Sequence, residues 1–217
     1  MRATVQSRQV AVGALALPGD LDIPPDAAGL VLFAHGSGSS RLSARNRWVA
    51  AVLRNHHLAT LLFDLLTEAE AADRRNVFDV ELLGERVEHA LDWVRQQPDL
   101  AGMCIGLFGA STGAAAALIA AAERPGRVAA VVSRGGRPDL AADRLVRVHA
   151  PTLLIVGGAD GEVLELNRRA LRLLTCRKRL EVVPEATHLF EEPGTLGSVA
   201  ELAAAWFENH LGDAWHP

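Results

Sequence analysis

The sequence predicts an α/β fold in which helices cover both faces of a mainly parallel sheet, with an antiparallel N-terminal edge. Two observations support this fold class. From residue 30 onward, short apolar runs alternate with longer helix-forming stretches, the pattern of parallel strands joined by helices. The segment before residue 30 differs and indicates edge strands. A chain of 217 residues can build a substantial core, and we expect one domain over 1–217.

The expected elements follow one another along the chain. Antiparallel edge strands are predicted within 10–17, before Pro18. The remaining strands are predicted at 30–34, 58–63, 103–108, 128–132, 152–156 and 180–183. Helices are predicted at 44–55, 78–96, 114–122, 138–146, 162–174 and 196–211.

The longest predicted helix, 78–96, shows how these assignments are made. Its apolar residues recur at spacings of three and four, which gives a stripe that faces the sheet, and Pro98 ends the helix. This stripe consists of Val80, Leu83, Val87, Leu91 and Val94.

Two intervals between elements bear on the active site. The charged segment 64–76 follows a strand, so we expect a solvated loop that borders the site. Between the strands at 128–132 and 152–156 only one short helix fits, so we expect no cap domain.

The sequence Gly109-Ala110-Ser111-Thr112-Gly113 lies between an apolar strand and an alanine-rich helix. A serine between two glycines on a sharp strand-to-helix turn is the nucleophile elbow of a serine hydrolase. The turn holds the serine hydroxyl clear of both elements, and the helix N-terminus offers N–H groups and a positive dipole end to a developing oxyanion. Ser111 is therefore the predicted nucleophile.

A serine nucleophile needs a base and a carboxylate that orients the base, in the chain order serine, acid, histidine. Asp160 follows the strand at 152–156, and His188 follows the strand at 180–183. Both lie beyond the C-terminal ends of predicted strands, where open parallel sheets bind ligands. We predict His188 as general base and Asp160 as the acid, with Glu162 as the alternative acid.

The oxyanion hole needs a second donor from the loop after an earlier strand. That loop is His35-Gly36-Ser37-Gly38-Ser39-Ser40, after the strand at 30–34. We assign the donors to the N–H groups of Thr112 and Ser37, with Gly38 as the alternative to Ser37. His35 precedes the nucleophile and so breaks the triad order, and we expect it to brace this loop.

Composition and charge exclude several partner classes. The formal net charge is −4 and no basic patch is present, which argues against nucleic-acid binding. No apolar run approaches the ~20 residues of a membrane span, and the polar N-terminus does not resemble a signal peptide, so we expect a cytoplasmic protein. The spacing of Cys and His residues does not suggest a metal site, and we expect neither metal nor cofactor. The oligomeric state stays open.

With elbow, acid and base in place, the chain resembles the α/β-hydrolase superfamily, and within it the small, capless dienelactone-hydrolase-like branch. The resemblance extends over roughly residues 10–211. It is carried by the motifs His35-Gly36-Ser37-Gly38-Ser39-Ser40-Arg41, Gly109–Gly113, Ser133-Arg134-Gly135-Gly136-Arg137-Pro138-Asp139-Leu140 and 186–194. Dienelactone hydrolases proper use a cysteine nucleophile, whereas this chain has Ser111. The resemblance implies ester hydrolysis through an acyl-enzyme.

The resemblance also draws attention to two arginines, Arg41 and Arg134, because dienelactone substrates carry a carboxylate. Arginine pairs with a carboxylate through two hydrogen bonds. Each arginine either binds an anionic group of the substrate or braces its own glycine-rich loop.

The sequence thus predicts a serine esterase acting on a small ester or lactone. A site without a cap offers few walls against which methylenes are buried, so we expect short acyl groups of about two to six carbons. Two alternatives remain open: another acyl-transfer activity on the same triad (thioesterase, acyltransferase or perhydrolase), or a non-catalytic binding protein that keeps the fold.

Overall fold

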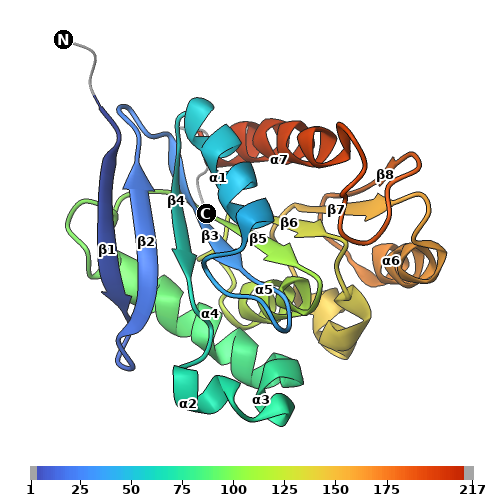
Figure 1. Ribbon diagram of the computed structural model, residues 1–217, viewed down its shortest axis with the longest axis horizontal. Coiled ribbons are helices and arrows are strands. Elements are labelled where there is room, and N and C mark those ends of the chain that lie inside the picture. Colours follow the sequence, from blue (N-terminus) through green and yellow to red (C-terminus); the bar gives the residue numbers. More distant parts are fainter. Residues whose placement is uncertain (1–3, 213–217) are drawn as a thin grey trace.

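The computed structural model describes residues 4–212, in which eight strands form one sheet in the order β1-β2-β4-β3-β5-β6-β7-β8 (Figure 1). The β2 strand runs antiparallel to both of its neighbours, and every pair from β4 to β8 is parallel. The strands are β1 (Gln6–Val12), β2 (Leu17–Ile23), β3 (Gly29–Ala34), β4 (Leu58–Phe63), β5 (Ile105–Ala110), β6 (Ala130–Arg134), β7 (Thr152–Gly157) and β8 (Lys178–Val183).

Helices cover both faces of the sheet, as Figure 1 shows. The α1 and α7 helices pack on one face, and α4, α5 and α6 pack on the other. The helices are α1 (Ala44–Asn55), α2 (Glu68–Ala71), α3 (Arg74–Phe78), α4 (Val80–Arg95), α5 (Thr112–Glu123), the 3-10 helix η1 (Pro138–Arg147), α6 (Gly161–Leu173) and α7 (Thr195–Leu211).

The central strands β3, β4, β5, β6 and β7 are buried along their whole length, which explains their nearly continuous apolar sequences. Alternate side chains enter the two layers, so that Val131 packs with α4 and α5 while Val132 packs with α1 and α7. The carboxyl ends of the six parallel strands β4, β3, β5, β6, β7 and β8 therefore lie along one edge of the sheet, and the predicted site residues follow strands at this edge.

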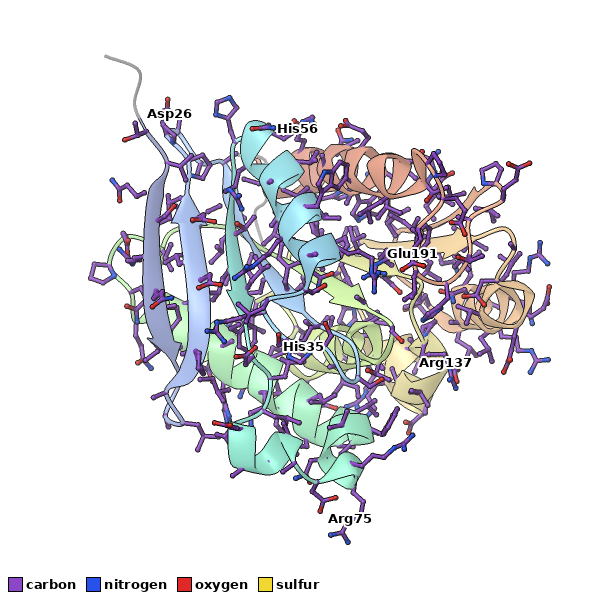
Figure 2. The ribbon with its side chains drawn as sticks, in the orientation of Figure 1. Asp26, His35, His56, Arg75, Arg137 and Glu191 are labelled. Atoms are coloured by element: carbon purple, nitrogen blue, oxygen red, sulfur yellow. The ribbon has the colours of Figure 1, made fainter. Side chains whose placement is uncertain are left out.

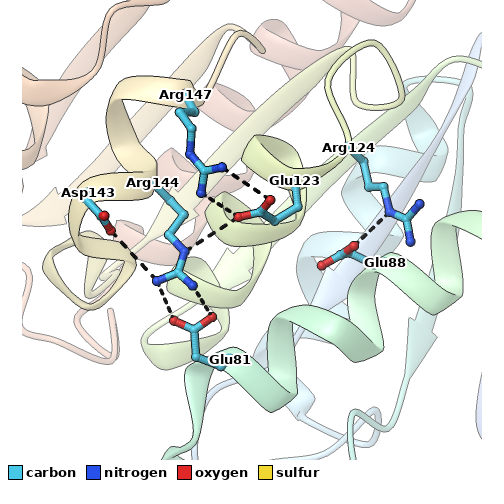
Figure 3. Close-up of polar contacts among 7 residues, drawn as sticks. All are labelled: Glu81, Glu88, Glu123, Arg124, Asp143, Arg144 and Arg147. Carbon is cyan, nitrogen blue, oxygen red and sulfur yellow. Dashed lines mark hydrogen bonds and ion pairs between the residues drawn. The ribbon is translucent and has the colours of Figure 1, made fainter.

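A network of ion pairs ties η1 to the neighbouring helices (Figure 3). Arg144 contacts Glu81 at the start of α4 and Glu123 at the end of α5, and Arg147 also contacts Glu123 at 2.6 Å. Each exposed pair contributes little by itself, but a shared network fixes geometry better than an isolated pair. It holds in place the helix that follows the site-forming turn 134–137.

The structure corrects several predicted elements. The segment 10–17 is the turn region of a hairpin whose strands, β1 and β2, extend beyond it on both sides. The predicted loop 64–76 contains two short helices, α2 and α3, each begun by a side-chain cap from Thr67 or Asp73. Phe78 belongs to α3, and Asp79 caps α4. The β5 and β6 strands each start and end two residues later than predicted, and the predicted helix 138–146 is the 3-10 helix η1.

No helix within residues 4–212 combines the length and the apolar character needed to cross a lipid bilayer.

Candidate active site

Ser111 occupies a strained turn between β5 and α5. Its backbone has φ 52° and ψ −121°, a conformation that residues other than glycine rarely adopt. The Ser111 N–H donates to the Arg134 carbonyl at 3.2 Å, and the Ser111 carbonyl accepts from the N–H groups of Ala114 at 3.1 Å and Arg137 at 3.1 Å. Bonds to a neighbouring strand and to the following helix thus hold the strained residue in place.

The two glycines of the elbow are required by close backbone contacts. A Cβ at Gly109 would lie 2.4 Å from the Cα of Ala114, and one at Gly113 would lie 2.2 Å from the carbonyl oxygen of Ala34. Neither contact is possible for a real side chain, because the atoms met are backbone atoms. The glycines let α5 start directly against β5 and the end of β3.

His188 and Asp160 are hydrogen-bonded to one another. The Nδ1 atom of His188 lies 2.7 Å from Oδ2 of Asp160, and the Asp160 side chain is 14% exposed against 38% for His188. Glu162, the alternative acid, is exposed in the first turn of α6. The structure therefore brings Asp160 to the histidine, and Nε2 is the ring nitrogen left to face a reacting group.

Backbone contacts between two turns position this pair. The Ala159 N–H donates to the Ala186 carbonyl at 3.0 Å, and a Cβ at Gly157 would lie 2.2 Å from the same carbonyl oxygen. The turn after β7 thus packs directly on the turn after β8. On the far side of His188, the Thr187 hydroxyl donates to Glu192 at 2.6 Å, which braces the histidine loop 184–194. This bond is the main reason that the pKa of Glu192 lies below its usual range.

The turn after β6 lies against both the serine and the histidine. The backbone carbonyl of Arg134 accepts a hydrogen bond from the Ser111 N–H. A Cβ built at the next residue, Gly135, would lie 3.1 Å from the His188 carbonyl oxygen and 3.6 Å from the His188 Nδ1. Asn167 of α6 is fully buried and donates to the Gly136 carbonyl at 2.9 Å, which anchors this turn. The turn 134–137 therefore contacts both Ser111 and His188, and His188 is in turn bonded to Asp160.

The oxyanion loop 35–40 touches the elbow from the other side. A Cβ at Gly36 would lie 3.1 Å from the Cβ of Ser111. The Ser37 N–H donates to Oγ1 of Thr112 at 2.8 Å, so this predicted oxyanion donor is already hydrogen-bonded in the free protein. The N–H of Gly38, the alternative donor, has no acceptor within residues 4–212. Both loop donors remain candidates beside the Thr112 N–H at the start of α5.

His35 braces the oxyanion loop. Its Nε2 accepts the Leu65 N–H at 3.1 Å, and its Nδ1 lies 3.1 Å from the Gly36 carbonyl oxygen, which assigns the proton to Nδ1. Burial lowers the pKa of His35 below its ordinary value of 6.5. A neutral ring suits the bond from Leu65, which needs a lone pair on Nε2.

The structure argues against Arg41 as a ligand for a substrate anion. Its guanidinium contacts Asp64 at 2.5 Å and Asp20 at 3.8 Å, and its backbone N–H donates to Asp64 at 2.7 Å. Two carboxylates already neutralise its charge. Of the two alternatives for Arg41, these contacts favour the loop-bracing role over substrate binding.

Arg134, unlike Arg41, has no carboxylate beside it among the described residues. Arg134 is 6% exposed, and within residues 4–212 its side chain makes a single hydrogen bond, from Nη2 to Oδ1 of Asn46 in α1 at 3.3 Å. Its guanidinium lies 5.9 Å from the ring centre of Phe190, and its Nε has no partner. Burial, with the nearby charge of Arg45, lowers the pKa of Arg134 to about 10. At neutral pH it is a buried cation without a carboxylate partner among the described residues.

Arg45 belongs to the same corner of the site. It contacts Glu191 at 3.0 Å in an ion pair that joins α1 to the histidine loop. Figure 2 shows Glu191 beside α1, with Arg137 on the η1 side and His35 below the start of α1. Sequence reasoning missed Asn46, Asn167 and Phe190, whose roles depend on packing between elements and leave no local motif.

Comparison with known proteins agrees with this geometry. The model of the dienelactone hydrolase family matches residues 63–211. The crystal structure of dienelactone hydrolase from Anabaena variabilis is 54% identical, covers 97% of this chain and 100% of that one, and superposes with a TM-score of 0.93. Est1E from Butyrivibrio proteoclasticus shares the fold, with a TM-score of 0.79 at 15% identity over 94% of this chain and 98% of that one.

A Mycobacterium tuberculosis protein with the provisional name of phosphoribosyl transferase is 59% identical over 203 residues. The matched region covers 94% of this chain but 46% of that protein, so the chain spans less than half the length of this curated relative.

The mainly parallel sheet, its antiparallel edge and its helical layers match the α/β-hydrolase fold expected from the sequence. The family match covers most of the chain, and the 54% identical structure is matched over its whole length. On these grounds, the chain belongs to the dienelactone hydrolase family.

Proposed function

We propose that this protein is a serine hydrolase that cleaves small carboxylic esters or lactones through an acyl-enzyme. The observation that carries the proposal is the 2.7 Å contact between His188 and Asp160, beside a serine held at φ 52° on a strand-to-helix turn. A hydrogen-bonded imidazole and carboxylate next to an elbow serine is the arrangement that turns a weak hydroxyl nucleophile into an effective one.

The reaction follows from these positions. His188 Nε2 takes the Ser111 hydroxyl proton as Oγ attacks the ester carbonyl, which gives a tetrahedral oxyanion. When this intermediate collapses, protonated His188 gives the proton to the leaving alcohol, and the acyl group stays on Ser111. Water then attacks the acyl-enzyme with His188 again as base, which releases the acid and restores the serine. Asp160 holds the imidazole tautomer and stabilises its charged form.

The oxyanion is assigned to the Thr112 N–H and to one N–H of the loop at Ser37 or Gly38. The dipole of α5 adds to these donors, because the helix begins directly after the nucleophile. Removal of one such donor in serine hydrolases costs about 10²–10³ in kcat.

We also propose that Arg134 binds an anionic group of the substrate. A buried, unpaired guanidinium is costly, and a carboxylate is the group that satisfies it best. Support comes from its orphan Nε and its single neutral partner, Asn46, together with its place on the turn that contacts Ser111.

The transferase name of the Mycobacterium tuberculosis relative is compatible with this proposal. More than half of that protein lies outside the matched region. We infer that its transferase name describes the unmatched part, and that the region related to this chain is a hydrolase unit. Assay of this chain alone for ester cleavage and for phosphoribosyl transfer tests that inference, and transfer without ester cleavage would contradict it.

Thioester cleavage or acyl transfer on the same triad is the competing activity. Matched oxygen esters and thioesters with the same acyl group separate the two. The proposal predicts a higher kcat/KM for the oxygen ester, and a preference of tenfold or more for the thioester would replace it with thioesterase activity.

A further inference from the structure

A cavity of about 510 Å³ opens beside the oxyanion loop. Part of its wall is the loop itself, residues 35–41, and another part comes from the segment that follows β4. The apolar side chains of that wall and floor are Pro18, Leu66, Val77 and Leu83. The wall exists because the charged segment 64–76 folds into α2 and α3 instead of remaining an open loop. We call this space the loop cavity.

Gly36 lies between the loop cavity and Ser111. This glycine lines the cavity, and a Cβ built on it would lie 3.1 Å from the Cβ of Ser111. Gly36 therefore joins the lining of the cavity to the nucleophile, and this contact is the basis for placing a group attached to Ser111 in the cavity. Another cavity, of about 430 Å³, is lined by charged residues between β2 and α1 and includes no residue of the oxyanion loop.

Strand order decides which half of the substrate enters the loop cavity. The cavity walls follow β3 and β4, on one side of β5, while Asp160 and His188 follow β7 and β8, on the other side. The leaving alcohol must face His188, since that residue supplies its proton. The acyl group is therefore the part directed toward β3 and β4.

The charges around the loop cavity decide the chemistry of that acyl group. Arg41 is neutralised by Asp64 and Asp20, and Glu68 at the rim has no ion-pair partner within residues 4–212. The lining thus carries more acidic than basic charge, which disfavours a carboxylate. The rest of the lining is apolar, and the burial of each methylene of an acyl chain against it stabilises binding by about 0.8 kcal/mol.

We propose that the loop cavity is the acyl subsite and that it takes an uncharged aliphatic acyl group of about six to eight carbons. This proposal rests on the proposed function, because it needs an acyl-enzyme on Ser111. It replaces the expectation that acyl groups of two to six carbons suffice, since that expectation assumed an open site without the α2–α3 wall. Any anionic group of the substrate then belongs to the leaving side, near Arg134.

The first measurement is a chain-length series of p-nitrophenyl esters from acetate to dodecanoate. The value of kcat/KM should rise about 4-fold per methylene over the first few additions, as expected for about 0.8 kcal/mol each, and level off near hexanoate to octanoate. A flat or falling series from acetate onward would overturn the proposal.

The second measurement uses Val77→Trp, which fills the loop cavity from α3. It should lower kcat/KM for the hexanoate at least 10-fold while the acetate changes less than 2-fold. Val5→Trp is the matched control, since Val5 is 43% exposed and lies just before β1, away from the cavity. Val77→Ala, which cannot overfill the site, should move the optimum to longer chains and keeps the test usable if the tryptophan variant unfolds.

A series with constant acetyl group and growing alcohol separates the two halves of the substrate. The proposal predicts that Val77→Trp leaves this series unchanged, and a loss confined to it would assign the cavity to the leaving group and overturn the proposal. Failure of the proposed function looks different: the folded wild type would then form no acyl-enzyme with any ester. Normal acetate turnover with no effect of Val77→Trp on the hexanoate would overturn the acyl subsite alone.

Discussion

Nδ1 of His188 lies 2.7 Å from Oδ2 of Asp160, across two turns that follow neighbouring parallel strands. The contact engages Nδ1 and leaves Nε2 as the ring nitrogen that is not bonded to Asp160. It also joins a histidine side chain that is 38% exposed to a carboxylate that is 14% exposed, so the histidine is held from its buried side.

Ser111→Ala and His188→Ala should each lower kcat by about 10³-fold or more, because nucleophile and base act as one unit. For the same reason, the double variant should be hardly worse than either single variant. Steady-state kinetics on a p-nitrophenyl ester provides the measurement. Retention of more than a tenth of the wild-type kcat by Ser111→Ala would remove the serine from the mechanism.

Asp160→Asn should be severe as well, since the amide can favour the wrong imidazole tautomer; a loss of about 10³–10⁴ in kcat is expected. Glu162→Gln is the matched control, two residues away and exposed in α6. It should leave kcat within about 2-fold. The reverse pattern, with a mild Asp160 variant and a severe Glu162 variant, would transfer the acid role to Glu162.

Arg134→Met tests the anion site in two ways. For an ester with a carboxylate on its alcohol part, KM should rise roughly 10- to 150-fold, the cost of losing a charge-assisted pair, while a neutral ester of equal size is unaffected. Without substrate, the free energy of unfolding should increase by about 1 kcal/mol or more, because an unpaired buried cation is replaced by an apolar chain.

Urea unfolding of the wild type and of Arg134→Met measures the difference in their free energies of unfolding. Equal losses on charged and neutral esters, together with a destabilised variant, would show that Arg134 braces the histidine loop through Phe190 and does not bind substrate.

His35 should make the protein less stable in acid. Its pKa is lowered in the folded state, so its contribution to stability is complete above the ordinary histidine value of 6.5 and is lost as the pH falls below that value through the folded pKa. His35→Gln, whose Oε1 can accept the Leu65 N–H, should lack this part of the acid sensitivity. Urea midpoints at pH 7.5 and pH 5 give the comparison, and an equal drop in both proteins would count against the assignment.

Gly109→Ala and Gly113→Ala should each destabilise the protein by several kcal/mol or prevent folding, because the new Cβ would lie 2.4 Å or less from backbone atoms. Gly102→Ala is the control, as a Cβ there meets no atom within 4 Å. Thermal unfolding measures all three. A Gly113→Ala protein as stable as Gly102→Ala would mean that the elbow is not packed against Ala34 as described.

Much of this architecture was predictable because it is local. The apolar runs and alanine-rich stretches locate the central strands and helices, and the positions of Ser111, Asp160 and His188 after successive strands are enough to place them on one edge of the sheet. The hairpin of β1 and β2 was harder to predict, since its exposed strand lacks an apolar pattern. The α2 and α3 helices were missed because short capped helices resemble polar loops in composition.

The roles of individual polar residues could not be predicted from the sequence. Arg41 and Arg134 both follow strands near glycine-rich turns, and their sequences give no reason to treat them differently. Their difference arises from distant partners: Asp20 and Asp64 surround Arg41, whereas Asn46 and Phe190 enclose Arg134. The bond between Ser37 and Thr112 is likewise a contact between two loops 75 residues apart.

The central claim is that Ser111 forms a covalent intermediate with the help of His188, and intact-protein mass spectrometry after reaction with a fluorophosphonate tests it most directly. The account predicts one added group per folded chain, located on Ser111 by peptide mapping, absent in Ser111→Ala and formed much more slowly in His188→Ala. A folded wild-type protein that stays unlabelled, or that is labelled at another residue, would contradict the account.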